Sequence, residues 1–159
     1  MSKRVAIYAG TFDPMTIGHR DLVERSLICF DKVILAVGIN PKKKTMFTVD
    51  ERMALATASL EPCWNVEVTS FSGLLVNYAK ERGVNVLVRG LRAFSDFEFE
   101  LQMALTNRKL EPEVETLFLM PSEEYSYISS SRVKEVASLG GDISDFVTKP
   151  VHKAILAKL

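Results

Sequence analysis

The T-x-G-H segment at residues 16–19 has residue types and spacing suited to holding an anion. Gly18 lets a ligand approach the backbone closely because it has no side chain. His19 falls on the first turn of a predicted helix, where free backbone N–H groups and the positive end of the helix dipole favour negative charge. The imidazole adds another N–H donor there. A surface helix cap without function has the same pattern, so the spacing alone leaves both interpretations open.

Two cationic loops follow apolar stretches of the chain. Lysines occupy 42–44, after the apolar residues 32–39, and Arg89 and Arg92 flank Gly90 at the end of another such stretch. The planar fork of arginine suits phosphate because it donates two parallel hydrogen bonds. Solvated lysines and an exposed arginine pair are also common on ordinary protein surfaces. Each loop therefore indicates phosphate binding only in combination with the others.

Three consecutive serines and an arginine, residues 129–132, open the predicted helix that continues as VKEVASLG. Serine hydroxyls beside the free N–H groups of a helix start are donors for an anion. Serine is also a preferred N-cap, so one of the three needs no function. Three in a row exceed what a cap requires, which favours a second anion-binding helix start.

Neither common phosphate-binding loop is present. The dinucleotide fingerprint G-x-G-x-x-G needs closely spaced glycines and an acid after the second strand, where this chain has Asn40. A P-loop ends in G-K-[ST], and no lysine follows Gly18. The chemistry must therefore come from separate loops that meet in the fold.

Strand-length apolar segments alternate with helical segments along the chain. Several strand segments are apolar on consecutive residues, which predicts burial on both faces of a parallel sheet. The alternation predicts an α/β fold, namely a Rossmann-like, doubly wound, five-stranded parallel sheet forming one domain over residues 1–159. The predicted strands are 5–9, 32–39, 65–70, 85–89 and 116–120.

The predicted helices carry start and stop signals. Residues 19–30 have apolar side chains at helical spacing, and Thr48 with Glu51 forms a capping-box pattern. Ser95 with Glu98 predicts another capping box, and a further helix is expected from about Ser72 to Gly83. Ligands of such sheets bind beyond the carboxyl ends of the strands, so we expect the loops described above to converge at that edge.

Composition excludes several classes of protein. The 159 residues contain 20 Lys and Arg and 20 Asp and Glu, a net charge of zero that argues against coating nucleic acid. Cys29 and Cys63 are too few and too unpatterned for a disulfide framework or a zinc site, so we expect free thiols. The absence of an 18-residue apolar run predicts a cytoplasmic protein that neither spans nor binds a membrane.

Together, GTFDPMTIGH, RGLRAFSDFEFE and ISSSRVKEV closely resemble the phosphopantetheine adenylyltransferase family of the nucleotidyltransferase superfamily. The resemblance spans nearly the whole chain. It implies transfer of AMP from ATP to 4'-phosphopantetheine, giving 3'-dephospho-coenzyme A and pyrophosphate with Mg²⁺. It also implies a homohexamer and allows feedback inhibition by coenzyme A. The superfamily often shows H-x-G-H, and Thr16 in the first place leaves His19 alone as the catalytic histidine.

The same resemblance implies roles for individual residues. It places catalysis on His19, Lys43 and Arg92, with His19 stabilising the transition state at the α-phosphate. Arg89 would contact the phosphate of phosphopantetheine. The implied ATP contacts are Thr11, Phe12, His19, Gly90, Leu91, Arg92, Glu100, Tyr125, Ser126, Tyr127, Ile128, Ser129, Ser130 and Ser131. The implied phosphopantetheine contacts are Thr11, Lys43, Leu74, Leu75, Arg89, Met103 and Asn107, while the Mg²⁺ ligands stay undetermined.

Three alternative functions can be compared with the sequence. A nicotinamide mononucleotide adenylyltransferase or a glycerol-3-phosphate cytidylyltransferase would share the first loop and the serine-rich helix start, but not RGLR followed by DFEFE. An inactive nucleotide-binding regulator would not need His19, Lys43 and Arg92 together. A detached aminoacyl-tRNA synthetase core is disfavoured because the chain is short and carries no net positive charge for RNA.

Overall fold

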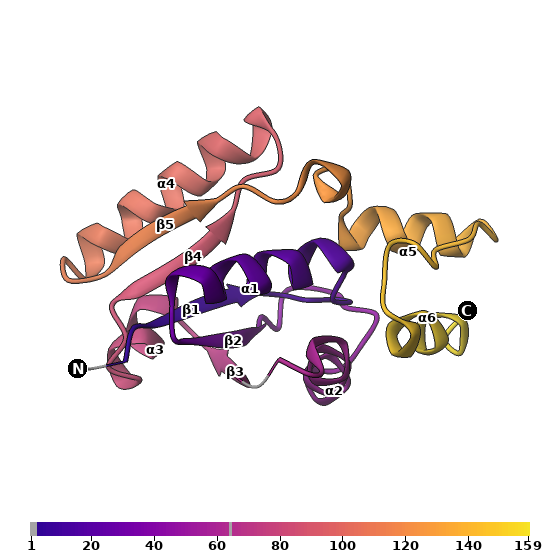
Figure 1. The fold of residues 1–159 in the computed structure, drawn as a ribbon, viewed down its shortest axis with the longest axis horizontal. Coiled ribbons are helices and arrows are strands. Elements are labelled where there is room, and N and C mark those ends of the chain that lie inside the picture. Colours follow the sequence, from indigo (N-terminus) through magenta and orange to yellow (C-terminus); the bar gives the residue numbers. More distant parts are fainter. Residues whose placement is uncertain (1–2, 64) are drawn as a thin grey trace.

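Five parallel strands form one sheet in the order β3-β2-β1-β4-β5 in the computed structural model, which describes residues 3–63 and 65–159 (Figure 1). All four neighbouring pairs are parallel. The predicted α/β fold with a five-stranded parallel sheet is therefore confirmed. The strands are β1 (Val5–Gly10), β2 (Lys32–Ile39), β3 (Val66–Ser72), β4 (Val86–Gly90) and β5 (Glu115–Leu119).

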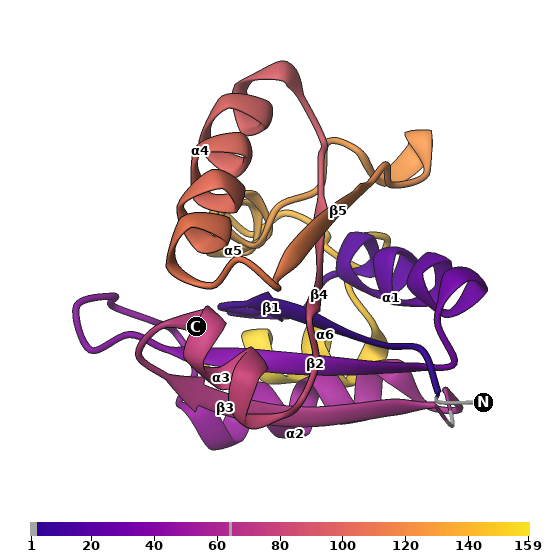
Figure 2. The same cartoon turned by 90° about the vertical axis from the view of Figure 1, so that its left-hand side faces the viewer.

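Helices cover both faces of the sheet, as Figure 2 shows for α1 and α4 on either side of β5. Helices α1 and α2 pack with the core of one face, and α3 packs with the core of the other. Within residues 3–63 and 65–159, no helix combines the length and the apolar character needed to cross a bilayer. The helices are α1 (Ile17–Cys29), α2 (Val49–Leu60), α3 (Leu75–Glu81), α4 (Phe94–Leu110), the short 3₁₀ turn η1 (Glu123–Tyr125), α5 (Ser130–Ser138) and α6 (Lys149–Leu156).

Strand β1 shows why the apolar residues are consecutive. Ala6 and Tyr8 belong to the core shared with α1 and α2, while Ile7 and Ala9 belong to the core shared with α3. Successive side chains of a strand point to opposite faces, so a strand covered on both faces needs an apolar residue at every position.

A third apolar cluster lies beyond the sheet, where α5 and α6 pack together. It contains Ile128, Val133, Val151 and Ile155, and it also buries Phe47 from the segment between β2 and α2. This cluster supports the serine-rich start of α5. Helix α6, which completes the cluster, is not among the helices predicted from the sequence.

Several predicted boundaries are wrong. Helix α4 begins at Phe94 with Ala93 as its N-cap and no capping side chain, so Ser95 lies inside the helix and is not its cap. Helix α3 begins at Leu75 because β3 continues to Ser72 and Gly73, at φ 79°, turns the chain between them. The capping box of Thr48 and Glu51 is confirmed, with both reciprocal hydrogen bonds present.

Candidate active site

A cavity of about 470 Å³ opens at the carboxyl ends of the strands, and it gathers loops that are far apart in the sequence. The chain goes from β1 to β2 on one side and later returns to β4 on the other, so β1 and β4 mark the point where the strand order reverses. Ligands of open α/β sheets bind at such a point. The predicted residues that line the cavity are Thr11, Phe12, His19, Lys43, Arg89, Gly90, Arg92, Glu100, Tyr125, Ile128, Ser129, Ser130 and Ser131.

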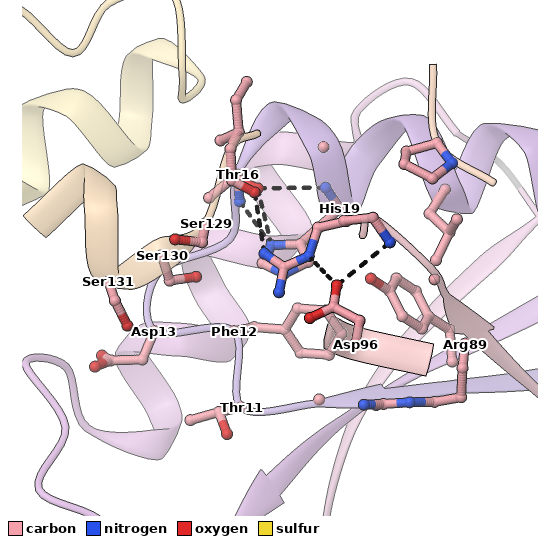
Figure 3. Close-up of a pocket in the computed structure, with 18 of the residues that line it drawn as sticks. Thr11, Phe12, Asp13, Thr16, His19, Arg89, Asp96, Ser129, Ser130 and Ser131 are labelled. Carbon is pink, nitrogen blue, oxygen red and sulfur yellow. Dashed lines mark hydrogen bonds and ion pairs between the residues drawn. The ribbon is translucent and has the colours of Figure 1, made fainter. Parts of the chain in front are cut away.

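His19 and Phe12 lie in the middle of this site, with the three serines on one side and Arg89 on the other (Figure 3). Helix α1 begins at Ile17, two residues before the predicted start, and Thr16 is its N-cap. The T-x-G-H segment is a capping box in which histidine takes the place usually held by Glu or Gln. The motif therefore combines a helix cap with a residue that lines the cavity.

The cap fixes which nitrogen of His19 carries the proton. The Thr16 backbone N–H donates to Nδ1 of His19 at 3.0 Å, so Nδ1 must be an acceptor. The neutral ring then has its proton on Nε2, which is free to donate to a ligand. Burial, followed by the positive charges of Arg92 and Arg89, lowers the pKa of His19 to about 4. At neutral pH His19 is therefore an uncharged hydrogen-bond donor.

Phe12 holds the first loop against this histidine. Its backbone has φ 48°, in the left-handed region that is costly for a bulky residue. Its ring meets the ring of His19 edge to face, with centroids 5.1 Å apart, and is buried. A Cβ on Gly10 would lie 3.0 Å from the Phe12 ring, a tighter contact than side chains usually make, so glycine favours this packing.

Lys43 reaches across from the loop after β2. Its Nζ donates to the Thr11 hydroxyl at 3.0 Å, although the lysine itself is exposed. Lys44 and Thr45 also line the cavity. The long, flexible side chain of Lys43 therefore places a positive charge beside the loop after β1.

Arg89 is held by an acid on α4. Its Nε donates to Oε2 of Glu100 at 2.7 Å and its Nη2 to Oε1 at 2.5 Å, while Nη1 donates to the Ala9 carbonyl at 2.6 Å. The hydrogen bonds and charge of Glu100 outweigh burial and raise the pKa of Arg89. Arg89 is therefore a fixed cation at the junction of β1 and β4.

Arg92 has a similar acidic partner, but it is more exposed. Its Nε donates to Oδ2 of Asp96 at 3.1 Å, and its Nη1 donates to the Ile128 carbonyl at 3.2 Å. The second bond links the segment after β4 to the segment that leads into α5. Arg92 therefore spans the cavity from one side to the other.

The three serines have different surroundings. Ser129 is the N-cap of α5 and accepts from the Arg132 N–H at 3.2 Å, while the Ser130 hydroxyl donates to the Pro14 carbonyl at 2.7 Å. Ser131 is exposed at the cavity. Two of the three hydroxyls thus organise the loops, and the free N–H groups at the start of α5 remain available to an anion.

Asp13 connects three parts of the site, and no role for it was predicted from the sequence. Its buried carboxylate accepts from the backbone N–H groups of Met46 and Phe47, each at 2.9 Å, and from Nζ of Lys134 at 2.7 Å. These hydrogen bonds outweigh burial and lower the pKa of Asp13. The residue joins the first loop, the lysine loop and α5. The sequence did contain one indication of this role, because Asp13 is the single acidic residue in a loop expected to meet several cationic loops.

Some predicted contacts lie away from the cavity wall. Ser126 donates its hydroxyl within the turn to the Glu123 carbonyl, and Tyr127 packs edge to face on Phe146. Leu75 packs on the core beneath the sheet, whereas Leu74 is exposed. The predicted residues that do not line the cavity are Leu74, Leu75, Leu91, Met103, Asn107, Ser126 and Tyr127.

The donor set of the site does not form a metal-binding cluster of its own. The three carboxylates at the cavity, Asp13, Glu100 and Asp96, are each paired with a cation. Among the described residues, no group of three or more His, Cys, Asp and Glu could hold a metal ion. A divalent cation would have to be bound mainly by the oxygens of an anionic ligand.

The cavity is therefore built to receive an anion of several charges. Lys43 and Lys44 face it from the loop after β2 and Arg92 from the segment after β4, and two helices begin at it. Its central histidine is neutral, and its Nε2–H is available to donate a hydrogen bond to a ligand. Electrostatic stabilisation by such fixed donors is usually the largest contribution to catalysis of a charged reaction.

Comparison with known proteins agrees with this chemistry. Residues 7–136 match the Cytidylyltransferase-like family. A phosphopantetheine adenylyltransferase of Alkaliphilus metalliredigens (strain QYMF) is 55% identical over 155 residues, which cover 98% of this chain and 99% of the relative. The chain belongs to the phosphopantetheine adenylyltransferase family.

Membership of the phosphopantetheine adenylyltransferase family is matched by the fold. The crystal structure of a putative nicotinate-nucleotide adenylyltransferase from Vibrio parahaemolyticus superimposes with a TM-score of 0.72 over 98% of this chain and 93% of the other. Its sequence identity is only 21%, so this likeness concerns the fold alone. The predicted nucleotidyltransferase fold is confirmed.

Proposed function

We propose that the chain transfers the adenylyl group of ATP to the phosphate of 4'-phosphopantetheine and releases pyrophosphate. The observation that carries this proposal is the place of His19 among the cations of the cavity. Its ring is neutral at pH 7 and has its proton on Nε2. A relative with 55% identity bears the name of this activity. The product is 3'-dephospho-coenzyme A, so the enzyme would act in coenzyme A biosynthesis.

The reaction does not require a nucleophilic side chain. A phosphate monoester has a second pKa near 6, so the acceptor is largely a dianion at neutral pH. Its oxygen attacks the α-phosphorus of ATP, a new P–O–P linkage forms, and the bond to the leaving pyrophosphate breaks. The protein then needs to align the two substrates and to stabilise the charge that develops.

His19 would donate its Nε2 proton in a hydrogen bond to the α-phosphate as charge builds on it. Lys43 would hold the incoming phosphate and neutralise the same transition state, because its ammonium already reaches the first loop at Thr11. Arg92 and the start of α5, with Ser129 and the neighbouring serines, would hold the leaving pyrophosphate. Arg89 would face the acceptor phosphate.

Mg²⁺ is the proposed cofactor, and it would arrive with the nucleotide. The phosphate oxygens of ATP and water supply the hard oxygen ligands that Mg²⁺ prefers. The cavity carboxylates are already paired with cations. Bound in this way, Mg²⁺ would offset negative charge on the triphosphate, while the residues of the chain do the positioning.

The main alternative is transfer to another phosphate acceptor, as in nicotinamide mononucleotide adenylyltransferases or glycerol-3-phosphate cytidylyltransferases. The high identity to a phosphopantetheine enzyme favours the first proposal. The structural neighbour with a nicotinate-nucleotide name shares the fold at only 21% identity. The choice of acceptor is therefore the point that an experiment must test.

Assembly into a homohexamer in the cytoplasm is a further part of the proposal. Helix α4 and the edge strand β5 carry exposed apolar side chains that a second copy could cover, and such patches typically mark interaction surfaces. Feedback inhibition by coenzyme A would follow if it competes for the same cavity. The exposed apolar residues on these two elements and directly after β5 are Phe97, Phe99, Leu101, Leu105, Leu110, Leu117 and Met120.

The deciding experiment measures pyrophosphate release from Mg-ATP with a panel of acceptors. The panel contains 4'-phosphopantetheine, nicotinamide mononucleotide, nicotinate mononucleotide and glycerol 3-phosphate, and CTP replaces ATP in a parallel series. Release that depends on 4'-phosphopantetheine and ATP supports the proposal. Release with another acceptor alone, or none with any pair, contradicts it.

A further inference from the structure

Arg52 is a buried arginine that no step of the proposed reaction uses. It lies in the first turns of α2, is 3% exposed, and does not line the cavity. Its Nη1 donates to the Thr11 carbonyl at 2.7 Å and to the Gly38 carbonyl at 3.0 Å. The guanidinium therefore joins the loop after β1 to the end of β2, from behind the wall of the cavity.

Arg52 has no acidic partner among residues 3–63 and 65–159, where every ion pair joins other side chains. Its Nε is buried without a hydrogen-bond partner in the same part of the chain. Burying a cation without a counter-ion costs several kcal/mol unless something compensates for it. Two carbonyl groups offset part of this cost, and an anion in the cavity on the other side of the loop would offset more.

The contact with Thr11 also fixes the direction of one peptide group. The peptide between Thr11 and Phe12 is trans, so its C=O and N–H point in opposite directions. Since the carbonyl points to Arg52, the Phe12 N–H points away from it, and the described hydrogen bonds leave that N–H free. Thr11 and Phe12 both line the cavity, and Figure 3 shows them on the same wall.

The same peptide leads into the strained residue of the site. Phe12 has φ 48° and its ring rests on His19, so a shift of the peptide would also move the surface that supports the histidine. A conformation in this region persists only when surrounding contacts hold it. Arg52 provides that contact on the carbonyl side.

We propose that Arg52 is a positioning residue for the polyphosphate of the substrate. It holds the Thr11 carbonyl so that the Phe12 N–H faces the bound anion, and its buried charge adds to the positive field of the cavity. The inference rests on the proposed function only in taking ATP as the source of the polyphosphate. Removing a residue that orients a metal ligand typically costs about 10–100-fold in affinity or activity, and by analogy we expect a loss in this range for Arg52.

The test compares Arg52→Met and Arg52→Lys with the wild type and with Arg4→Met, which removes an exposed guanidinium paired with Asp31. Calorimetry measures the Kd of ATP and of adenosine, and thermal unfolding reports folding. For Arg52→Met we expect ATP to bind at least about tenfold more weakly and kcat to fall by about 10–100-fold. Adenosine binding should change less than about twofold, because adenosine carries no phosphate. Arg52→Lys should be intermediate, and Arg4→Met should match the wild type.

Several outcomes overturn the proposal. It is wrong if folded Arg52→Met binds ATP and turns over like the wild type. Equal weakening of ATP and adenosine would show a general structural role, and so would failure of both variants to fold. An inactive wild type that binds ATP would contradict the proposed function and leave the binding comparison valid, so the two failures are distinguishable.

Discussion

The carboxylate of Glu100 on α4 accepts two parallel hydrogen bonds from the guanidinium of Arg89 on β4, from Nε at 2.7 Å and from Nη2 at 2.5 Å. Both side chains are largely buried. Sequence resemblance had placed these two residues at different ligands, Glu100 with ATP and Arg89 with phosphopantetheine. The structure shows them as one ion pair at the junction of β1 and β4. The acid therefore determines where the guanidinium lies before any ligand binds.

Glu100→Gln is expected to lower the free energy of unfolding by an amount near the lower end of the roughly 3–5 kcal/mol seen when a buried pair loses one partner. Arg89 would keep the Ala9 carbonyl and one amide oxygen, which limits the loss. Urea denaturation measures the change. Glu98→Gln, at an exposed position on the same helix, is the matched control. A variant within about 0.5 kcal/mol of the wild type would mean that the pair contributes little.

His19→Ala should lower kcat by about 10²–10³-fold and change the KM of ATP much less, because the lost hydrogen bond is strongest in the transition state. Steady-state pyrophosphate release measures both constants. The other histidine of the chain, His152 on α6, provides the control His152→Ala, which should keep wild-type kinetics. Near-normal kcat in folded His19→Ala would show that the ring does not stabilise the transition state.

Stability should depend on pH through His19 in a defined range. Its folded pKa of about 4 lies below the unfolded value of 6.5, so its contribution is complete above pH 6.5. As the pH falls toward 4, the unfolded state takes up a proton that the folded state does not, and stability decreases by up to about 3 kcal/mol.

The variant His19→Gln isolates this contribution, because glutamine is also a capping-box residue at this position. Between pH 7 and pH 4 the wild type should therefore lose up to about 3 kcal/mol more stability than the variant. Chemical denaturation across that range measures it. Parallel curves for the two proteins would refute the lowered pKa.

Lys43→Ala should lower kcat by at least about tenfold, since a charge that neutralises the transition state is lost. Its neighbour Lys42 gives a matched control, because Lys42→Ala removes the same charge from the same exposed loop. Only the Lys43 ammonium bonds to Thr11. The assignment fails if both substitutions reduce the rate equally, which would indicate a general effect of charge.

The implied contact of Leu74 with 4'-phosphopantetheine can be tested directly, because this side chain is 54% exposed at the start of α3. Leu74→Asp should weaken 4'-phosphopantetheine binding and leave ATP binding unchanged, because only the first ligand has the apolar arm. Leu75 is less suitable because it packs on the core. Calorimetry with both ligands measures the effect, and the exposed Ile28→Asp serves as the control. Loss of ATP affinity alone would contradict the assignment of Leu74 to 4'-phosphopantetheine.

The sheet and the convergence of the loops could be predicted because each depends on local pattern. Consecutive apolar residues marked strands covered on both faces, and parallel strands bring their following loops to one edge. The contacts that hold the loops together are not local. Asp13 acquires its role from Met46, Phe47 and Lys134, and no spacing in the sequence states those distances.

Arg52 left a signal that was available in the sequence. It shares a helix face with the buried residues Ala56, Ser59 and Leu60, at spacings of four, seven and eight. A charged residue on an apolar face indicates a buried partner. The identity of that partner, the carbonyl of Thr11, required the folded chain because the two lie 41 positions apart.

The third apolar cluster lies under two parts of the cavity wall. Phe47, four residues after Lys43, is buried against the same small core as Val133 of α5 and Val151 of α6. The loop that carries Lys43 and the helix α5 are therefore packed on the same hydrophobic cluster, which is distinct from the two clusters on the faces of the sheet. A substitution that loosens this core would therefore displace Lys43 and the serines at the start of α5 together, and with them groups proposed to hold both the incoming phosphate and the leaving pyrophosphate.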